Sequence, residues 1–125
     1  DIKRLGGQYD IRRIAYDPWS AYQLAGELRG EGWPMHEMRQ GWKTMSEPTK
    51  GLMRSVLERR IRHGGHGVLR WNMDNMVVIT DAPGNIKPDK SKTNQKIDGG
   101  VALIMALGAA TSDLSDPPQV YMVSA

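Results

Sequence analysis

Cysteine and phenylalanine are both missing from this sequence of 125 residues. The absence of cysteine excludes a disulfide scaffold, a thiolate metal site and a cysteine nucleophile, and it favours a reducing compartment. No apolar run reaches the length that crosses a membrane, so we expect no membrane partner. Without phenylalanine, the core has to be built from aliphatic residues, the 8 methionines and a few of the 4 tryptophans and 4 tyrosines.

The chain also lacks a recognisable beginning. It opens with Asp1, Ile2, Lys3 and Arg4, which resemble neither an initiator methionine nor a signal peptide, and this start suggests a piece of a longer protein. Its length is enough for one domain with a modest core. The 17 Lys+Arg against 14 Asp+Glu leave a net charge of +3, which permits nucleic-acid binding without requiring it.

One stretch, from Gly99 to Ala110, has no polar side chain on any face and predicts a helix inside the protein. The acid that opens it, Asp98, could simply satisfy free backbone N–H groups of the first turn. Helical spacing, however, aligns Asp98 with Met105, so we expect its side chain to lean along a buried surface, where a charge needs a partner or a metal. The approach to this acid is rich in lysine, which suits a metal site that handles a polyanion: Lys87, Lys90, Lys92 and Lys96.

The first half of the chain predicts a strand followed by a helix, the repeating unit of an α/β sheet. Residues 11–16 are a strand candidate that Pro18 closes, which places Asp17 at the carboxyl end of a strand. Ser20 then offers an N-cap for an amphipathic helix that stops at Gly30.

Two more elements are expected before the middle of the chain. Residues 33–38 predict a second, shorter strand. Residues 44–48 have the composition of a helix cap, and apolar residues at helical spacing predict a helix over roughly residues 48–62. The following loop contains His63 and His66, which we reject as a metal site because no third ligand lies on a rigid element.

The second half predicts a hairpin and a tail. Strand candidates at residues 68–71 and 76–80 flank a turn at residues 72–75, and a second turn at residues 81–85 leads to residues 86–88. After the apolar helix the composition shifts to Thr, Ser, Asp and Pro. We therefore expect a domain over residues 1–110 and a flexible tail over residues 111–125.

Two acids stand at element ends, where an open α/β sheet exposes its functional groups: Asp17 and Asp98. Carboxylates without a usable Cys or His set are hard oxygen ligands that suit Mg²⁺ or Mn²⁺. Two such ions roughly 3.5 to 4 Å apart can hydrolyse a phosphodiester. Aspartate is ordinary in turns. Of the acids in turns, only Asp89 lies in the lysine-rich segment at residues 87–96, which we call the lysine loop, and Asp89 is therefore a candidate substitute ligand.

Five segments are distinctive in combination: YDIRRIAYDPW at residues 9–19, MRQG at 38–41, RHGG at 62–65, GNIKPDK at 84–90 and KIDG at 96–99. Together, in this order, they resemble the C-terminal part of a tailed-bacteriophage terminase large subunit. Proteins of that family join a packaging ATPase to a nuclease of the RNase H-like fold, which cuts concatemeric viral DNA with three acidic residues and two divalent metals.

The resemblance implies an α/β domain, a partial RNase H-like nuclease with a mixed sheet flanked by helices. It implies Asp17 and Asp98 as catalytic metal ligands for Mg²⁺ or Mn²⁺, and a DNA-binding role for Lys87, Lys90 and Lys96. The implied partners are double-stranded DNA, the portal and the small terminase subunit, in the cytoplasm of the bacterial host.

The chain departs from the family at its start. No strand before Ile11 can carry the family's first acid, and no phosphate-binding loop of the ATPase occurs. A missing N-terminal segment would supply both. The competing function is a truncated prophage remnant that binds DNA or the portal without cutting, and a more distant one is another RNase H-like nuclease such as a junction resolvase. The four tryptophans are too scattered for a base-stacking platform, so we expect core or rim packing for Trp19, Trp33, Trp42 and Trp71.

Overall fold

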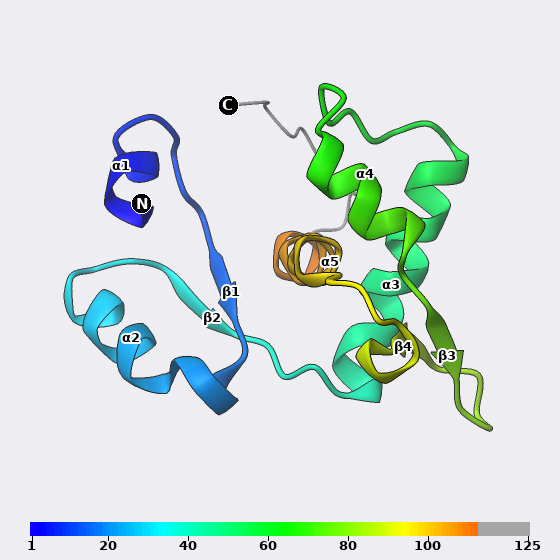
Figure 1. Cartoon of the computed structure of the whole chain (residues 1–125). Helices are drawn as coiled ribbons and strands as arrows, with labels where there is room; N and C mark the ends of the chain where they lie inside the picture. Colours follow the sequence, from blue (N-terminus) through cyan, green and yellow to red (C-terminus); the bar gives the residue numbers. More distant parts are fainter. Residues whose placement is uncertain (113–125) are drawn as a thin grey trace.

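The structure is a computed structural model that describes residues 1–112. Figure 1 shows a unit of helix and parallel strands on one side, a group of helices with a hairpin on the other, and a single helix between them. The elements in chain order are α1 (Ile2–Gly6), β1 (Ile14–Tyr16), α2 (Pro18–Gly30), β2 (Met35–Glu37), α3 (Trp42–Leu57), α4 (Gly67–Asp74), β3 (Val78–Thr80), β4 (Ile86–Pro88), the 3-10 helix η1 (Lys90–Lys92) and α5 (Asp98–Thr111).

The strand-helix-strand unit expected in the first half is confirmed. Strands β1 and β2 are parallel, with Ala15 opposite His36, and α2 connects them. Both strands are shorter than expected. The N-cap of α2 is Asp17, not Ser20, because the Asp17 carboxylate accepts the backbone N–H of Trp19 at 3.0 Å and Pro18 occupies the first helical position.

Helix α3 begins and ends earlier than the sequence predicts. It starts at Trp42 after Gly41 and therefore contains Pro48 in its interior, where a missing backbone hydrogen bond costs on the order of 3 kcal/mol. Burial of the stripe Met45, Thr49 and Leu52 offsets that cost, since α3 packs along α5. The helix ends at Leu57 because Arg59 has a left-handed backbone with φ of 57°.

The sequence predicts a hairpin at residues 68–80, and the prediction of its first strand, at residues 68–71, is wrong. Residues 68–71 belong to α4, whose N-cap is His66, with Nδ1 accepting the backbone N–H of Leu69 at 3.1 Å. The hairpin that does form is antiparallel, joins β3 to β4, and turns through residues 81–85. Asp81 closes this turn by accepting the backbone N–H and the side-chain amide of Asn85.

Helix α5 is the centre of the core, as its apolar sequence predicts. Ile104 is fully buried, and α5 packs against α3, α4 and β1. Arg13, just before β1, donates to the carbonyl of Ala109 at 2.8 Å and so ties the strand unit to the end of α5. The remaining buried residues are mostly aliphatic or methionine, as expected for a chain without phenylalanine: Met38, Met45, Leu52, Leu69, Ile97, Val101, Leu103, Met105 and Leu107.

The C-terminal boundary differs slightly from the prediction, because α5 continues to Thr111. The rest of the expected tail, residues 113–125, lies outside the described residues. In the part of the chain from residue 1 to 112, no helix is long and apolar enough to span a bilayer.

Candidate functional site

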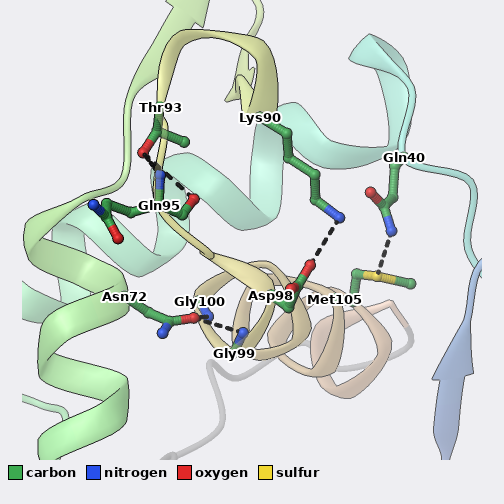
Figure 2. A network of polar contacts seen from close by, with 9 residues as sticks. All are labelled: Gln40, Asn72, Lys90, Thr93, Gln95, Asp98, Gly99, Gly100 and Met105. Carbon is green, nitrogen blue, oxygen red and sulfur yellow. Dashed lines mark hydrogen bonds and ion pairs between the residues drawn. The ribbon is translucent and has the colours of Figure 1, made fainter.

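Asp98 is the first residue of α5, and its carboxylate points into solvent. The Asp98 side chain is 69% exposed. One of its carboxylate oxygens forms an ion pair with the Lys90 ammonium at 3.3 Å (Figure 2). The expectation of a buried orientation is wrong. Asp98 shares an exposed stripe with Ala102, Ala106 and Ala110, whereas the face that contains Met105 is buried.

The start of α5 is capped by another residue. The side-chain oxygen of Asn72, from α4, accepts the backbone N–H of Gly99 at 2.7 Å and of Gly100 at 3.3 Å (Figure 2). Asn72 is buried, so these are hydrogen bonds shielded from water. Because Asn72 satisfies these N–H groups, helix capping does not account for the Asp98 carboxylate.

Asp17 follows β1 directly and is partly buried. One carboxylate oxygen accepts the backbone N–H of Trp19, which fixes the side chain at the carboxyl end of the strand. Close by, the backbone N–H of Met38 donates to the carbonyl of Tyr16 at 2.8 Å, so the segment after β2 stays beside this end of β1. The position expected for Asp17 is therefore confirmed.

The lysines expected to contact DNA lie on β4 and on the segment that leads from β4 to α5. Lys87 is on β4, and its ammonium lies 4.9 Å from the centre of the Trp42 ring, a cation–π contact. Lys90 is in η1 and pairs with Asp98, while Lys96 is exposed just before α5. Two of the three lysines are therefore held in place by a partner at the site.

A pocket of about 240 Å³ lies between these elements. Met45, Ile79 and Val101 form its apolar lining. Its polar lining consists of Gln40, Lys87, Asp89, Lys90 and Ser91. Two ammonium groups and a side-chain amide outweigh the single Asp89 carboxylate in this lining, which favours an anionic guest such as a phosphate group.

Gln40 was not singled out from the sequence, although it belongs to the MRQG segment. It follows β2, and its amide nitrogen lies 3.7 Å from the sulfur of Met105 on α5 (Figure 2). Gln40 thus links the carboxyl end of the parallel strands to the helix that begins with Asp98. Because α5 also packs against β1, the two candidate acids lie on elements that touch.

Asp89, the candidate substitute ligand, is already engaged. Its carboxylate accepts the hydroxyl of Ser91 at 2.6 Å and the backbone N–H of Ser91 at 2.9 Å, which caps η1. These two hydrogen bonds are the main reason that the pKa of Asp89 lies below its ordinary value, and Lys92 and Lys87 lower the pKa further. Asp89 therefore shapes the lysine loop.

The described residues do not assemble a complete carboxylate cluster. Among residues 1–112, no three His, Cys, Asp or Glu side chains lie close enough together to hold a metal ion. The structure thus offers Asp17 and Asp98 at the ends of two elements, with Lys90 beside the second, and among residues 1–112 no third acid completes a metal-binding group with them.

Trp19 departs most from its expected role. Its side chain is 95% exposed, so it packs neither in the core nor at a rim. Trp42, in contrast, is partly buried under Lys87, and Trp33 packs against Gly6 of α1, where an added Cβ would lie 2.2 Å from the indole ring.

Comparison with known proteins gives a consistent result. Residues 2–113 match the family described as "Terminase large subunit, endonuclease domain". The chain is 38% identical over 118 residues to the terminase, large subunit, of Enterobacteria phage HK97, which covers 93% of this chain and 23% of that protein. Protein YmfN of Escherichia coli (strain K12) is 38% identical over 97 residues, which covers 75% of this chain and 21% of that protein.

The fold gives the same match. The crystal structure of the HK97 bacteriophage large terminase superimposes with a TM-score of 0.80 and 40% sequence identity, and the match covers 87% of this chain and 23% of that chain. The chain therefore spans between a fifth and a quarter of the length of these proteins.

Proposed function

The chain belongs to the terminase large subunit endonuclease domain family, whose RNase H-like α/β fold it shares, and we propose that it takes part in metal-dependent hydrolysis of DNA phosphodiester bonds. The substrate we propose is concatemeric viral DNA during genome packaging. The resemblance expected from the five sequence segments is confirmed at the level of the family and the fold.

The observation that carries this proposal is the state of Asp98. Asn72 caps α5, so the Asp98 carboxylate is not needed as the cap of this helix. The Asp98 carboxylate is instead exposed beside a lysine and a polar pocket. An exposed acid beside a lysine that also lines a pocket offers one metal ligand and one phosphate contact of the kind that phosphodiester hydrolysis uses.

The donor chemistry of the two acids fits a hard divalent cation. Asp17 and Asp98 offer carboxylate oxygens, which Mg²⁺ and Mn²⁺ prefer. When bound, a pair of such ions would activate the attacking water and stabilise the leaving oxygen. A cation bound at Asp98 would weaken the ion pair between Asp98 and Lys90. The Lys90 ammonium could then contact a phosphate group.

The lysines account for binding without base-specific readout. Lys87, Lys90 and Lys96 would neutralise backbone phosphates on either side of the pocket, which positions the strand but carries no sequence information. The Trp42 ring holds Lys87 in place before DNA arrives, so less side-chain freedom is lost on binding.

The third acid and the remaining partners lie outside this chain in our proposal. Among the described strands β1 pairs only with β2, which leaves its other edge for a strand from a preceding segment that carries the first acid. The packaging ATPase would belong to the same segment. The portal and the small terminase subunit would be further partners, in the cytoplasm of the bacterial host.

A non-catalytic role is the second candidate. It is favoured by one observation, that residues 1–112 assemble no group of three potential metal ligands. In that case the lysine loop would serve only to bind DNA or the portal.

Nicking of supercoiled plasmid in Mn²⁺ by this chain, joined to the preceding segment that would carry the first acid, tests the proposal. Asp98→Asn keeps the shape of the side chain and removes its charge, and Asp74→Asn is the matched control because Asp74 is an exposed acid at the end of α4. We expect nicking by the wild type and by Asp74→Asn and none by Asp98→Asn.

The other outcomes separate the two candidates. No nicking by any of the proteins, with retained DNA binding, would support the non-catalytic role. Equal nicking by wild type and Asp98→Asn would remove Asp98 from the mechanism and contradict the proposed site.

A further inference from the structure

Two large aromatic side chains on α2 are exposed, whereas side chains of this kind are usually largely buried. Trp19 is 95% exposed and Tyr22 is 75% exposed. Residues three apart in a helix lie on the same face, about 5 to 6 Å apart at their Cβ atoms. Trp19 and Tyr22 therefore form one aromatic surface, which we call the α2 aromatic face.

This face contributes nothing to the packing of α2. The buried side chains of this helix are Ala25 and Leu28. The helix would therefore keep its place without Trp19 and Tyr22. Large exposed aromatic surfaces that do not serve the core are typical of binding sites.

The α2 aromatic face lies next to Asp17. The backbone N–H of Trp19 donates to the Asp17 carboxylate at 3.0 Å, so the first turn of α2 is fixed to the candidate acid. Arg39, whose side chain is largely exposed and pairs with Glu37 at 3.3 Å, follows β2 at the same edge of the parallel pair.

We propose that the α2 aromatic face binds unpaired bases of DNA beside the phosphodiester held at Asp17. The inference rests on the proposed function and adds a preference for substrate: DNA with an opened or interrupted strand over intact duplex. Aromatic rings stack on any base, so this contact requires no particular sequence. A protein partner is the less favoured occupant, because a partner seated on Trp19 would also cover the approach to Asp17.

The proposed preference for interrupted DNA has a physical reason if the two strands are cut one after the other. A site that cuts one strand at a time leaves an interrupted duplex after its first cut, and bases at the interruption lose a stacking neighbour. Trp19 and Tyr22 would replace that neighbour, which keeps the interrupted duplex bound. Pro18 and the hydrogen bond from the backbone N–H of Trp19 to Asp17 fix the backbone from which the Trp19 ring projects.

Fluorescence anisotropy with two labelled DNA probes in EDTA tests the proposal without cutting. One probe is an intact duplex, and the other is the same duplex with a short single-stranded gap. We expect the wild-type chain to prefer the gapped probe. Trp19→Ala should bind the gapped probe about tenfold more weakly and lose the preference, and Tyr22→Ala should have a smaller effect in the same direction.

Two controls make the result specific. Tyr9→Ala removes another exposed aromatic side chain, 48% exposed and placed before β1, and should leave both affinities unchanged. Trp19→Phe retains an aromatic ring and should keep most of the preference. Circular dichroism of each variant checks folding, and we expect no change because the deleted side chains are exposed.

The outcomes distinguish this inference from the proposed function. If the wild type binds both probes equally, or if Trp19→Ala keeps the preference for the gap, the α2 aromatic face does not bind DNA. Binding of both probes that depends on Lys90 would in that case leave the proposed function standing. If the wild type binds neither probe, both the inference and the proposed function are wrong.

Discussion

The side-chain oxygen of Asn72 lies 2.7 Å from the backbone nitrogen of Gly99, across 27 residues of sequence. This hydrogen bond joins α4 to the start of α5 and takes over the capping that a first-turn acid usually supplies. Asn72 caps the helix, and the carboxylate of the neighbouring Asp98 stays exposed beside Lys90.

Asn72→Ala should destabilise the protein by about 1–2 kcal/mol, because it removes a helix cap and leaves backbone N–H groups of α5 without their partner. Urea denaturation followed by circular dichroism measures this change. Asn75→Ala is the matched control, since Asn75 donates to the Trp71 carbonyl on the surface at the end of α4 and caps no other helix. Equal stabilities of Asn72→Ala and the wild type would show that another group caps α5.

Lys90→Ala should weaken DNA binding at low salt while changing stability by less than about 1 kcal/mol. The Lys90–Asp98 pair is exposed on both sides, and such pairs contribute little to folding. The logarithm of the binding constant falls with the logarithm of the salt concentration, and each lysine that contacts a phosphate adds about one unit to the steepness of this line. The line for Lys90→Ala should therefore be about one unit less steep than that of the wild type. Lys43→Ala, an exposed lysine on α3, is the comparison. The same salt slope in Lys90→Ala and wild type would exclude a phosphate contact by Lys90.

The sequence predicts best where one segment decides its own structure. The run from Gly99 to Ala110 has no polar side chain, which predicts a buried helix, and α5 is indeed buried at Ile104 and along most of its surface, with an exposed stripe of alanines on one face. Pro18 after a β-branched and aromatic run places Asp17 at the end of a strand for an equally local reason.

The sequence predicts local structure poorly where contacts with residues far along the chain determine it. The β-branched and aromatic residues at 68–71 suggest a strand, but burial of Leu69 and Asn72 one turn apart stabilises a helix there. The orientation of Asp98 depends on Asn72, which no local pattern connects with it. Trp19 is exposed because the packing of α2 uses other residues, and spacing along one helix cannot show this.

Ile104→Ala should cost about 2–5 kcal/mol, because Ile104 is fully buried in the centre of α5 and the deleted methyl groups leave a cavity. That amount is a large fraction of the stability of a typical domain. Thermal denaturation checks the effect against Ala106→Ser, a change on the exposed stripe of the same helix that should be nearly neutral. A small effect of Ile104→Ala would mean that α5 is not the centre of the core.

Ser91→Ala should raise the pKa of Asp89 toward its ordinary value of 3.8, because the Ser91 hydroxyl is the largest cause of the lowered pKa. The sign of the effect on stability follows from the direction of the shift. A carboxyl group whose pKa is lower in the folded state binds fewer protons there than in the unfolded state. Its contribution is therefore complete above the ordinary pKa and is lost as the pH falls through the lowered one.

Wild type and Ser91→Ala should thus differ in stability at neutral pH and converge in acid. Urea denaturation at several pH values measures the difference, and NMR titration of the Asp89 carboxyl carbon reads the pKa directly. Thr93→Val is the control, because the Thr93 hydroxyl bonds within the same loop to the Gln95 backbone and not to Asp89. An unchanged Asp89 titration in Ser91→Ala would show that the backbone N–H of residue 91, with Lys92 and Lys87, sets the pKa and that the Ser91 hydroxyl does not.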